Sequence, residues 1–175
     1  PSTVLPVGRF EFLLREGVEL RAGTVDCARG RVEIELDGTS ARIELVLGTT
    51  TDVLWLRDPA GLIAEAKARP AWEWCAEEFE RRGFAPPEML ADGWVQACPE
   101  DPALCVLARP LDGGFGITLC LGEDGVASQG KANALLDRFR GDALLAECDR
   151  WWAAYWQRTP EVTIPDPFWR DFLVY

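Results

Sequence analysis

None of the 175 residues is histidine, so the chain has no imidazole side chain for acid–base chemistry. This excludes a Ser-His-Asp triad, a Cys-His dyad and an HExxH zinc site within these residues. There are 29 Asp and Glu side chains, but no spacing marks two of them as a general acid and its base. Glu33, Glu35 and Glu44 alternate with apolar residues, which is typical of the solvated face of a sheet. The sequence therefore predicts no catalytic residue in this chain.

Six cysteines are the other reactive side chains, and they are Cys27, Cys75, Cys98, Cys105, Cys120 and Cys148. No CxxC motif occurs among them, so neither a zinc knuckle nor a redox motif is predicted. Most lie among apolar neighbours, which indicates small buried thiols in a reducing compartment. One or two disulfides in an exported protein remain the alternative. No metal site and no cofactor is predicted.

The charge of the chain limits its partners. The formal net charge is -11, and almost all of it lies in residues 1–130. A chain this acidic repels polyanions, so neither nucleic acid nor an anionic membrane is an expected partner. The sequence has no apolar stretch of about 20 residues, as a membrane span would need, and no visible signal peptide. We therefore expect a cytoplasmic location, with export left open.

Strands are the elements that would position any site, because apolar and polar residues alternate with a period of two over most of the chain. The clearest hairpin joins residues 31–36 to residues 41–45 through Asp37-Gly38, with one apolar and one charged face. Further strands are predicted at 52–57, 62–68, 94–98, 103–109 and 115–121, and a helix at 71–82. Many short strands separated by turns predict a mainly β fold, an antiparallel β-sandwich over residues 1–128. C-terminal linker helices follow in residues 129–175.

The period changes to 3.6 from Lys131, which predicts two helices. Gly141 is expected to stop the first helix, and Asp142 is expected to cap the second. The second helix carries one broad apolar stripe, formed by Leu144, Leu145, Cys148, Trp151, Trp152, Tyr155 and Trp156. So much aromatic area predicts packing in the core or against another domain. The alternative is that Trp156, near the helix end, stacks on a sugar.

A third helix is predicted after residue 165. Asp166 followed by Pro167 is typical of a helix start, and Asp166 is interpreted as its cap, with a contact at an active-site rim as the alternative. The sequence then stops at Tyr175, before the apolar face of that helix is complete. We expect that the natural polypeptide continues or that another chain completes the packing.

The junction between the last two helices resembles a known family. The residues that carry the resemblance are Trp151, Trp152, Tyr155, Trp156, Arg158, Thr159, Pro160, Val162, Ile164, Pro165 and Asp166. They look like the linker-to-barrel junction of bacterial six-hairpin glycoside hydrolases, and are closest to the inverting alpha-L-fucosidase family and its relatives. Two earlier segments, residues 5–10 and 24–32, are similar to the first strands of that family.

The resemblance implies an N-terminal β-sandwich, a helical linker and an (α/α)6 barrel that holds the catalytic carboxylates. Residues 129–175 would then be the linker and the start of the barrel. The chain would be a non-catalytic part of an enzyme of carbohydrate metabolism, inactive by itself. Its expected partners are the barrel or a second chain, packing on Trp151, Trp152, Tyr155 and Trp156, and an oligosaccharide near Trp156 and Asp166. The alternative is a free-standing module for oligomerisation, or for carbohydrate binding through Trp55 or Trp94.

Overall fold

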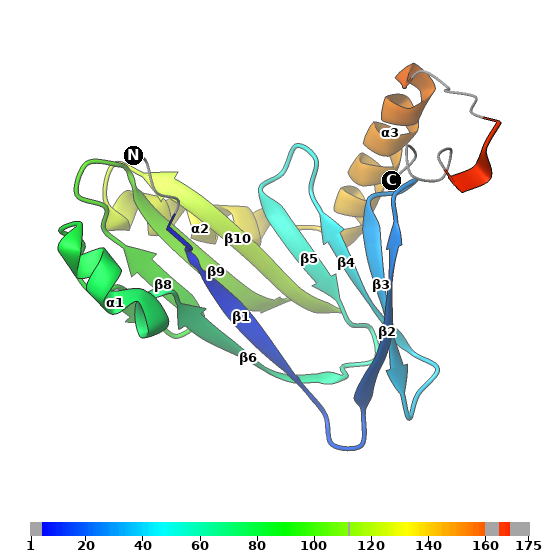
Figure 1. Ribbon diagram of the computed structural model, residues 1–175, viewed down its shortest axis with the longest axis horizontal. Coiled ribbons are helices and arrows are strands. Elements are labelled where there is room, and N and C mark those ends of the chain that lie inside the picture. The colour runs from blue at the N-terminus through cyan, green and yellow to red at the C-terminus, as the bar shows by residue number, and fades with distance from the viewer. Residues whose placement is uncertain (1–4, 112, 160–164, 169–175) are drawn as a thin grey trace.

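The computed structural model describes residues 5–111, 113–159 and 165–168 of the chain. Strands make up more of this described part than helices do, and all paired strands are antiparallel (Figure 1). Two of its three helices follow the last strand. The predicted mainly β fold with antiparallel sheets and C-terminal helices is therefore confirmed.

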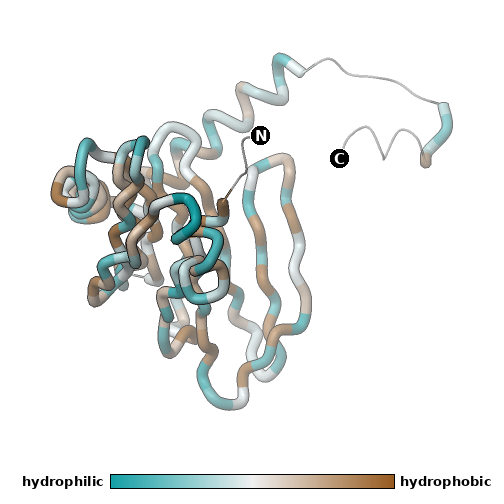
Figure 2. Tube along the Cα trace, turned by 60° about the vertical axis from the view of Figure 1, so that its left-hand side comes forward, coloured by the Kyte–Doolittle hydropathy of each residue, from teal (hydrophilic) through white to brown (hydrophobic). Residues whose placement is uncertain are grey.

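The larger sheet has eight strands in the order β2-β3-β4-β5-β10-β9-β8-β7. These are β2 (Glu19–Asp26), β3 (Arg31–Asp37), β4 (Arg42–Leu47), β5 (Val53–Arg57), β7 (Glu88–Leu90), β8 (Gly93–Gln96), β9 (Ala103–Leu111) and β10 (Gly114–Gly122). The predicted hairpin is β3–β4, in which Ile34 stands opposite Ile43. Polar and apolar residues alternate along β3, as the predicted period of two requires, whereas β5 is apolar except at its last residue. Hydrophilic and hydrophobic segments follow one another along much of the trace (Figure 2).

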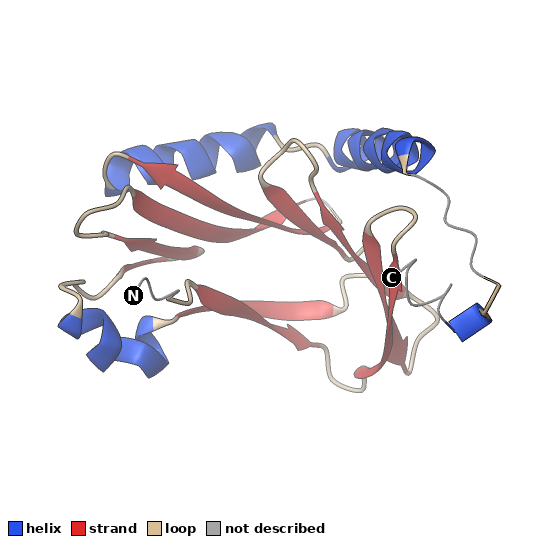
Figure 3. Cartoon of the chain, turned by 45° about the horizontal axis from the view of Figure 1, so that its top comes forward, coloured by secondary structure: helices blue, strands red, loops and turns tan. Residues whose placement is uncertain are grey.

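A second, two-stranded sheet pairs β1 (Gly8–Leu14) with β6 (Ile63–Pro70). It packs face to face on the larger sheet through aromatic side chains. The ring of Phe10 lies 5.3 Å from that of Trp94, and the ring of Phe12 lies 5.5 Å from that of Phe115. The second layer of the sandwich is thus much smaller than the first, and helices cover the opposite face of the larger sheet (Figure 3).

Helix α2 (Gly125–Arg138) covers that opposite face, and its start was predicted wrongly at Lys131. The helix begins after Asp124, whose Oδ1 accepts a hydrogen bond of 2.8 Å from the backbone N–H of Ala127. The buried residue of its first turns is Ser128, a small polar side chain, so this part of the helix has little apolar periodicity. The predicted domain boundary at residue 128 lies within this helix.

Helix α3 (Gly141–Arg158) begins where the sequence predicted a helix stop. Extended backbone at Phe139 ends α2, and Gly141 is already the first helical residue. A Cβ at Gly141 would lie 2.4 Å from the ring of Trp55, so this glycine permits close packing rather than ending a helix. Asp142 lies in the first turn and makes no capping hydrogen bond, so the prediction that it caps α3 is wrong.

Three apolar clusters form the core. The first, beneath α2, contains Val53, Val95, Cys105, Leu107, Cys120, Ala132 and Leu136. The second, between the sheets, contains Leu36, Ile43, Leu56 and Ile63, and the third, beneath α3, contains Val46, Trp55, Leu144 and Cys148. The predicted helix near residue 75 is α1 (Trp72–Arg81), which buries Phe79. No helix in the described residues is long and apolar enough to cross a membrane.

Candidate docking surface on the C-terminal helix

Helix α3 extends beyond one end of the larger sheet, beside the ends of β3 and β4 (Figure 1). Glu147 holds its first half to the loop between β4 and β5. Oε1 accepts hydrogen bonds from the backbone N–H groups of Thr49 and Thr50, at 2.9 and 2.7 Å, and from the Thr49 hydroxyl at 3.0 Å. Oε2 accepts a bond of 2.8 Å from the Thr51 hydroxyl. One half-buried carboxylate is therefore surrounded by four donors.

These donors set the charge state of Glu147. Partial burial by itself raises the pKa of this carboxyl, but the hydrogen bonds from Thr50, Thr51 and Thr49 outweigh burial and lower the pKa to about 2. Glu147 therefore stays ionised well into the acid range, and the attachment of α3 to this loop is a charge-assisted one.

A second attachment joins the other half of α3 to the turn between β2 and β3. Trp152 packs so closely on Gly30 that a Cβ at that glycine would lie 1.9 Å from the indole Nε1. Trp156 donates a hydrogen bond of 3.1 Å from Nε1 to the carbonyl of Cys27. Arg31 forms an ion pair with Asp149. Two loops that are distant in sequence thus fix the helix along its length.

The aromatic stripe of α3 is divided by these contacts. Trp152 and Trp156 are half-buried against the turn, whereas Trp151 and Tyr155 are 37% and 39% exposed. The rings of Trp151 and Tyr155 stack with centroids 5.4 Å apart and an interplanar angle of 9°. We call these two residues the exposed aromatic pair. Within the described residues, Trp152 and Trp156 are packed as the sequence predicted for the whole stripe, but Trp151 and Tyr155 are not.

The two residues predicted to contact substrate lie in different settings. Trp156 is half-buried, its ring stacks on Trp152 at 6.3 Å and its indole N–H is already engaged. Asp166 is exposed, and its Oδ1 accepts a hydrogen bond of 2.9 Å from the backbone N–H of Phe168. No hydrogen bond in the described residues joins Asp166 to Trp156. The rest of the predicted third helix, residues 169–175, lies outside the described residues.

The two tryptophans considered as sugar platforms are core residues. Trp55 is 5% exposed and Trp94 is 1% exposed. Trp55 packs under α3, and Trp94 packs against Phe10 between the sheets. The interpretation of these two rings as exposed binding platforms is therefore wrong, because each fills the space between two layers.

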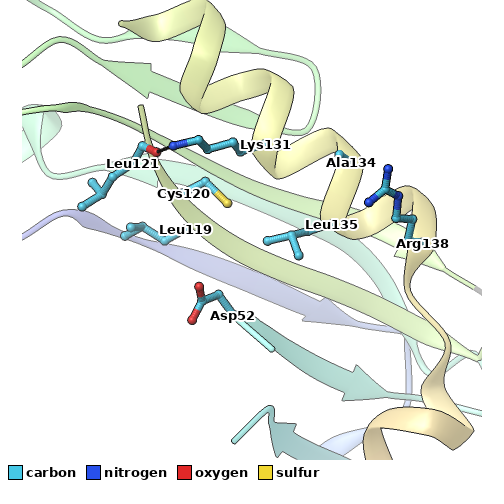
Figure 4. A pocket seen from close by; sticks show the side chains of 8 residues that line it. All are labelled: Asp52, Leu119, Cys120, Leu121, Lys131, Ala134, Leu135 and Arg138. Carbon is cyan, nitrogen blue, oxygen red and sulfur yellow. Dashed lines mark hydrogen bonds between the residues drawn. The ribbon is translucent and has the colours of Figure 1, made fainter. Parts of the chain in front are cut away.

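A groove that the sequence did not predict follows the edge of β10. β5 pairs with β10 only as far as Thr118, so on that side Leu119–Gly122 have no strand neighbour in the described residues. A shallow groove of about 610 Å³ opens there, between this edge and α2 (Figure 4). Lys131 donates a hydrogen bond of 2.9 Å to the carbonyl of Leu121, and Arg138 and Asp52 complete the polar rim. Strand lengths, which set the position of the groove, were predicted too coarsely to reveal it.

The described residues contain no group of three or more His, Cys, Asp or Glu side chains arranged to hold a metal ion. Comparisons of the chain with protein-family models, with curated proteins and with solved structures gave no match. The exposed aromatic pair is thus characterised by its geometry alone.

Proposed function

We propose that this chain is the non-catalytic β-sandwich and linker segment of a glycoside hydrolase, and that the exposed aromatic pair of α3 contacts the catalytic (α/α)6 barrel. The observation that carries the proposal is the contrast within the aromatic stripe of α3. Trp152 and Trp156 pack on the β2–β3 turn, while Trp151 and Tyr155 remain exposed. Large aromatic side chains held on a rigid helix are typical of a surface that another body covers.

A helical partner suits this surface. Trp151 and Tyr155 are four residues apart, so they lie on adjacent turns of one helix face and would fill the groove of a second helix. Ala154 is exposed next to them, and a small residue there permits close approach. The barrel in the resembled family consists of paired helices and follows the linker directly, which agrees with both features.

The alternative, a free-standing module for carbohydrate binding or oligomerisation, uses the same two rings differently. A sugar would stack on an exposed ring face, and a second copy would bury the pair in a symmetric contact. Each alternative gives a different result in solution, so one set of measurements separates all three.

The test compares residues 1–175 with the product of the complete reading frame that contains them, on a panel of aryl glycosides. We expect the complete product to hydrolyse at least one substrate and residues 1–175 to hydrolyse none. In the complete product, replacing Trp151 and Tyr155 together by Ala should lower the unfolding temperature and the activity. Val126→Ala removes another exposed side chain, 81% exposed on α2, and should leave both unchanged.

Two results would contradict the proposal. One is a reading frame that encodes no domain of paired helices. The other is a purified chain of residues 1–175 that binds glycans on an array and loses that binding when Trp151 is replaced, which would support the carbohydrate-binding alternative. A stable dimer at micromolar concentration in light scattering, lost in the double variant, would support the oligomerisation alternative.

A further inference from the structure

Two cysteines stand directly opposite each other in the larger sheet. Cys105 of β9 and Cys120 of β10 are register partners in an antiparallel pair. Opposed residues in such a pair have Cα atoms about 4.5–5.5 Å apart, which is within the range of about 4.4–6.8 Å that a disulfide requires. Both side chains belong to the apolar cluster beneath α2, so they lie on the same face of the sheet. Both thiols are free.

None of the other four cysteines has such a partner. Cys148 lies in the separate cluster beneath α3, where its thiol donates a hydrogen bond of 3.2 Å to the carbonyl of Leu47. Cys27, Cys75 and Cys98 are half-buried, in the β2–β3 turn, in α1 and after β8 respectively. No strand register in the described residues matches any of these four with another cysteine. The fold therefore selects a single pair.

The groove at the edge of β10 gives access to this pair from one side. Cys120 is 7% exposed and lines the groove, with its sulfur turned toward Leu135 (Figure 4). Cys105 is completely buried behind it. A small oxidant in the groove would thus meet Cys120 first, and Cys105 is the thiol placed to react next.

We propose that Cys105 and Cys120 are a redox pair that closes to a cross-strand disulfide when the protein meets a hydroperoxide. The Cys120 thiolate attacks the peroxide, forming an S–O bond as the O–O bond breaks and water leaves. The Cys105 thiolate then attacks the sulfenic sulfur, so that the S–S bond forms as the S–O bond breaks, and the hydroxide that leaves takes up the proton lost by the Cys105 thiol to give a second water. Two thiols and one hydrogen peroxide thus give one disulfide and two waters.

The electrostatics of the pair make closure slow. Burial raises the pKa of the Cys105 thiol to about 11, and the neighbouring Cys120 and Asp92 add to the effect. Because the Cys105 thiolate is scarce at neutral pH, the pair responds to sustained oxidation rather than as a fast sensor. Closure would tie β9 to β10 beneath α2, and a dithiol reductant would reverse it.

The test is peptide mapping of the folded protein before and after exposure to hydrogen peroxide. After unfolding and alkylation of the free thiols, we expect a peptide linked through Cys105 and Cys120 and four alkylated cysteines. The linked peptide should be about 2 Da lighter than the sum of its two unalkylated thiol peptides, because closure removes two hydrogen atoms. Dithiothreitol should restore all six thiols. The proposal is overturned if both thiols of the pair stay alkylatable, if they reach the sulfinic state without a link, or if another pair links instead.

Variants identify the order of the steps. Cys105→Ala should leave Cys120 as a sulfenic acid that dimedone labels, and no linked peptide should form. Cys148→Ala removes a cysteine that is equally buried but in another cluster, and the linked peptide should form as before. If Cys105→Ala fails to fold, the map of the unaltered protein still decides the proposal.

Discussion

The charge-assisted attachment of α3 can be tested by replacing Glu147 with Gln. The carboxylate has an ordinary pKa of 4.5 and a folded pKa of about 2. At roughly 1.4 kcal/mol per pH unit, this difference corresponds to about 3.4 kcal/mol of stability at neutral pH. Solvent screening of a half-buried group reduces the value to about 2 kcal/mol. We expect Glu147→Gln to lower the free energy of unfolding by about that amount at pH 7, because an amide cannot accept all four hydrogen bonds.

The stabilisation that Glu147 contributes depends on pH. Because the folded pKa is lowered, the stabilisation is present above the unfolded pKa near 4.5 and is lost as the pH falls toward 2. The difference between the variant and the original protein should therefore shrink by roughly a quarter between pH 7 and pH 4.

Urea unfolding followed by tryptophan fluorescence measures this difference at each pH. Glu123→Gln is the matched control, since Glu123 is exposed and its side chain has no hydrogen bond or ion pair within the described residues, and it should change the stability little. A Glu147→Gln protein that is as stable as the control at pH 7, or a difference that grows as the pH falls, would refute the reasoning.

Two further predictions concern the contact of α3 with the β2–β3 turn and the N-terminal cap of α2. Gly30→Ala should detach Trp152 from the β2–β3 turn, because the new Cβ would lie 1.9 Å from the indole nitrogen. The control is Gly17→Ala, since Gly17 also has a positive φ but a Cβ there would have nothing within 4 Å. Gly30→Ala should therefore lower the free energy of unfolding more than Gly17→Ala does. Urea unfolding of both variants checks this, and equal costs would show that Trp152 can move aside freely. Asp124→Ala should cost about 1 kcal/mol through loss of the α2 cap, whereas Asp142→Ala should cost less. Thermal unfolding that ranks these two in the opposite order would favour the cap that the sequence indicated.

The strands were predictable where one face is buried and the other wet. Residues 31–36 and 41–45 alternate in polarity, and residues 103–109 and 115–121 are apolar runs separated by a turn, so their boundaries were close to those of β3, β4, β9 and β10. β2 was not predicted as a strand, since it lies at the edge of the sheet and nearly all its residues are exposed. Periodicity reports burial, and an edge strand with two wet faces has no such signal.

The sequence predicted which aromatic residues lie on the candidate surface, but not which of them the rest of the chain covers. Spacings of three and four placed Trp151, Trp152, Tyr155 and Trp156 on one side of a helix, as the structure confirms. Which of them would be covered depends on where the β2–β3 turn ends, and that is set by tertiary contacts over more than a hundred residues of sequence. Glu147 gave no signal at all, because its four donors come from a loop nearly as distant.

The contacts of α3 with two loops also limit how the lengths of those loops can vary among related sequences. The segment between β4 and β5 presents its backbone N–H groups to one carboxylate, and the turn between β2 and β3 fits beneath one indole ring. An added residue in either loop would move these groups out of reach. Most surface loops accept insertions. We therefore expect homologues to keep residues 26–31 and 48–52 constant in length, and to collect their insertions at the opposite ends of the same strands.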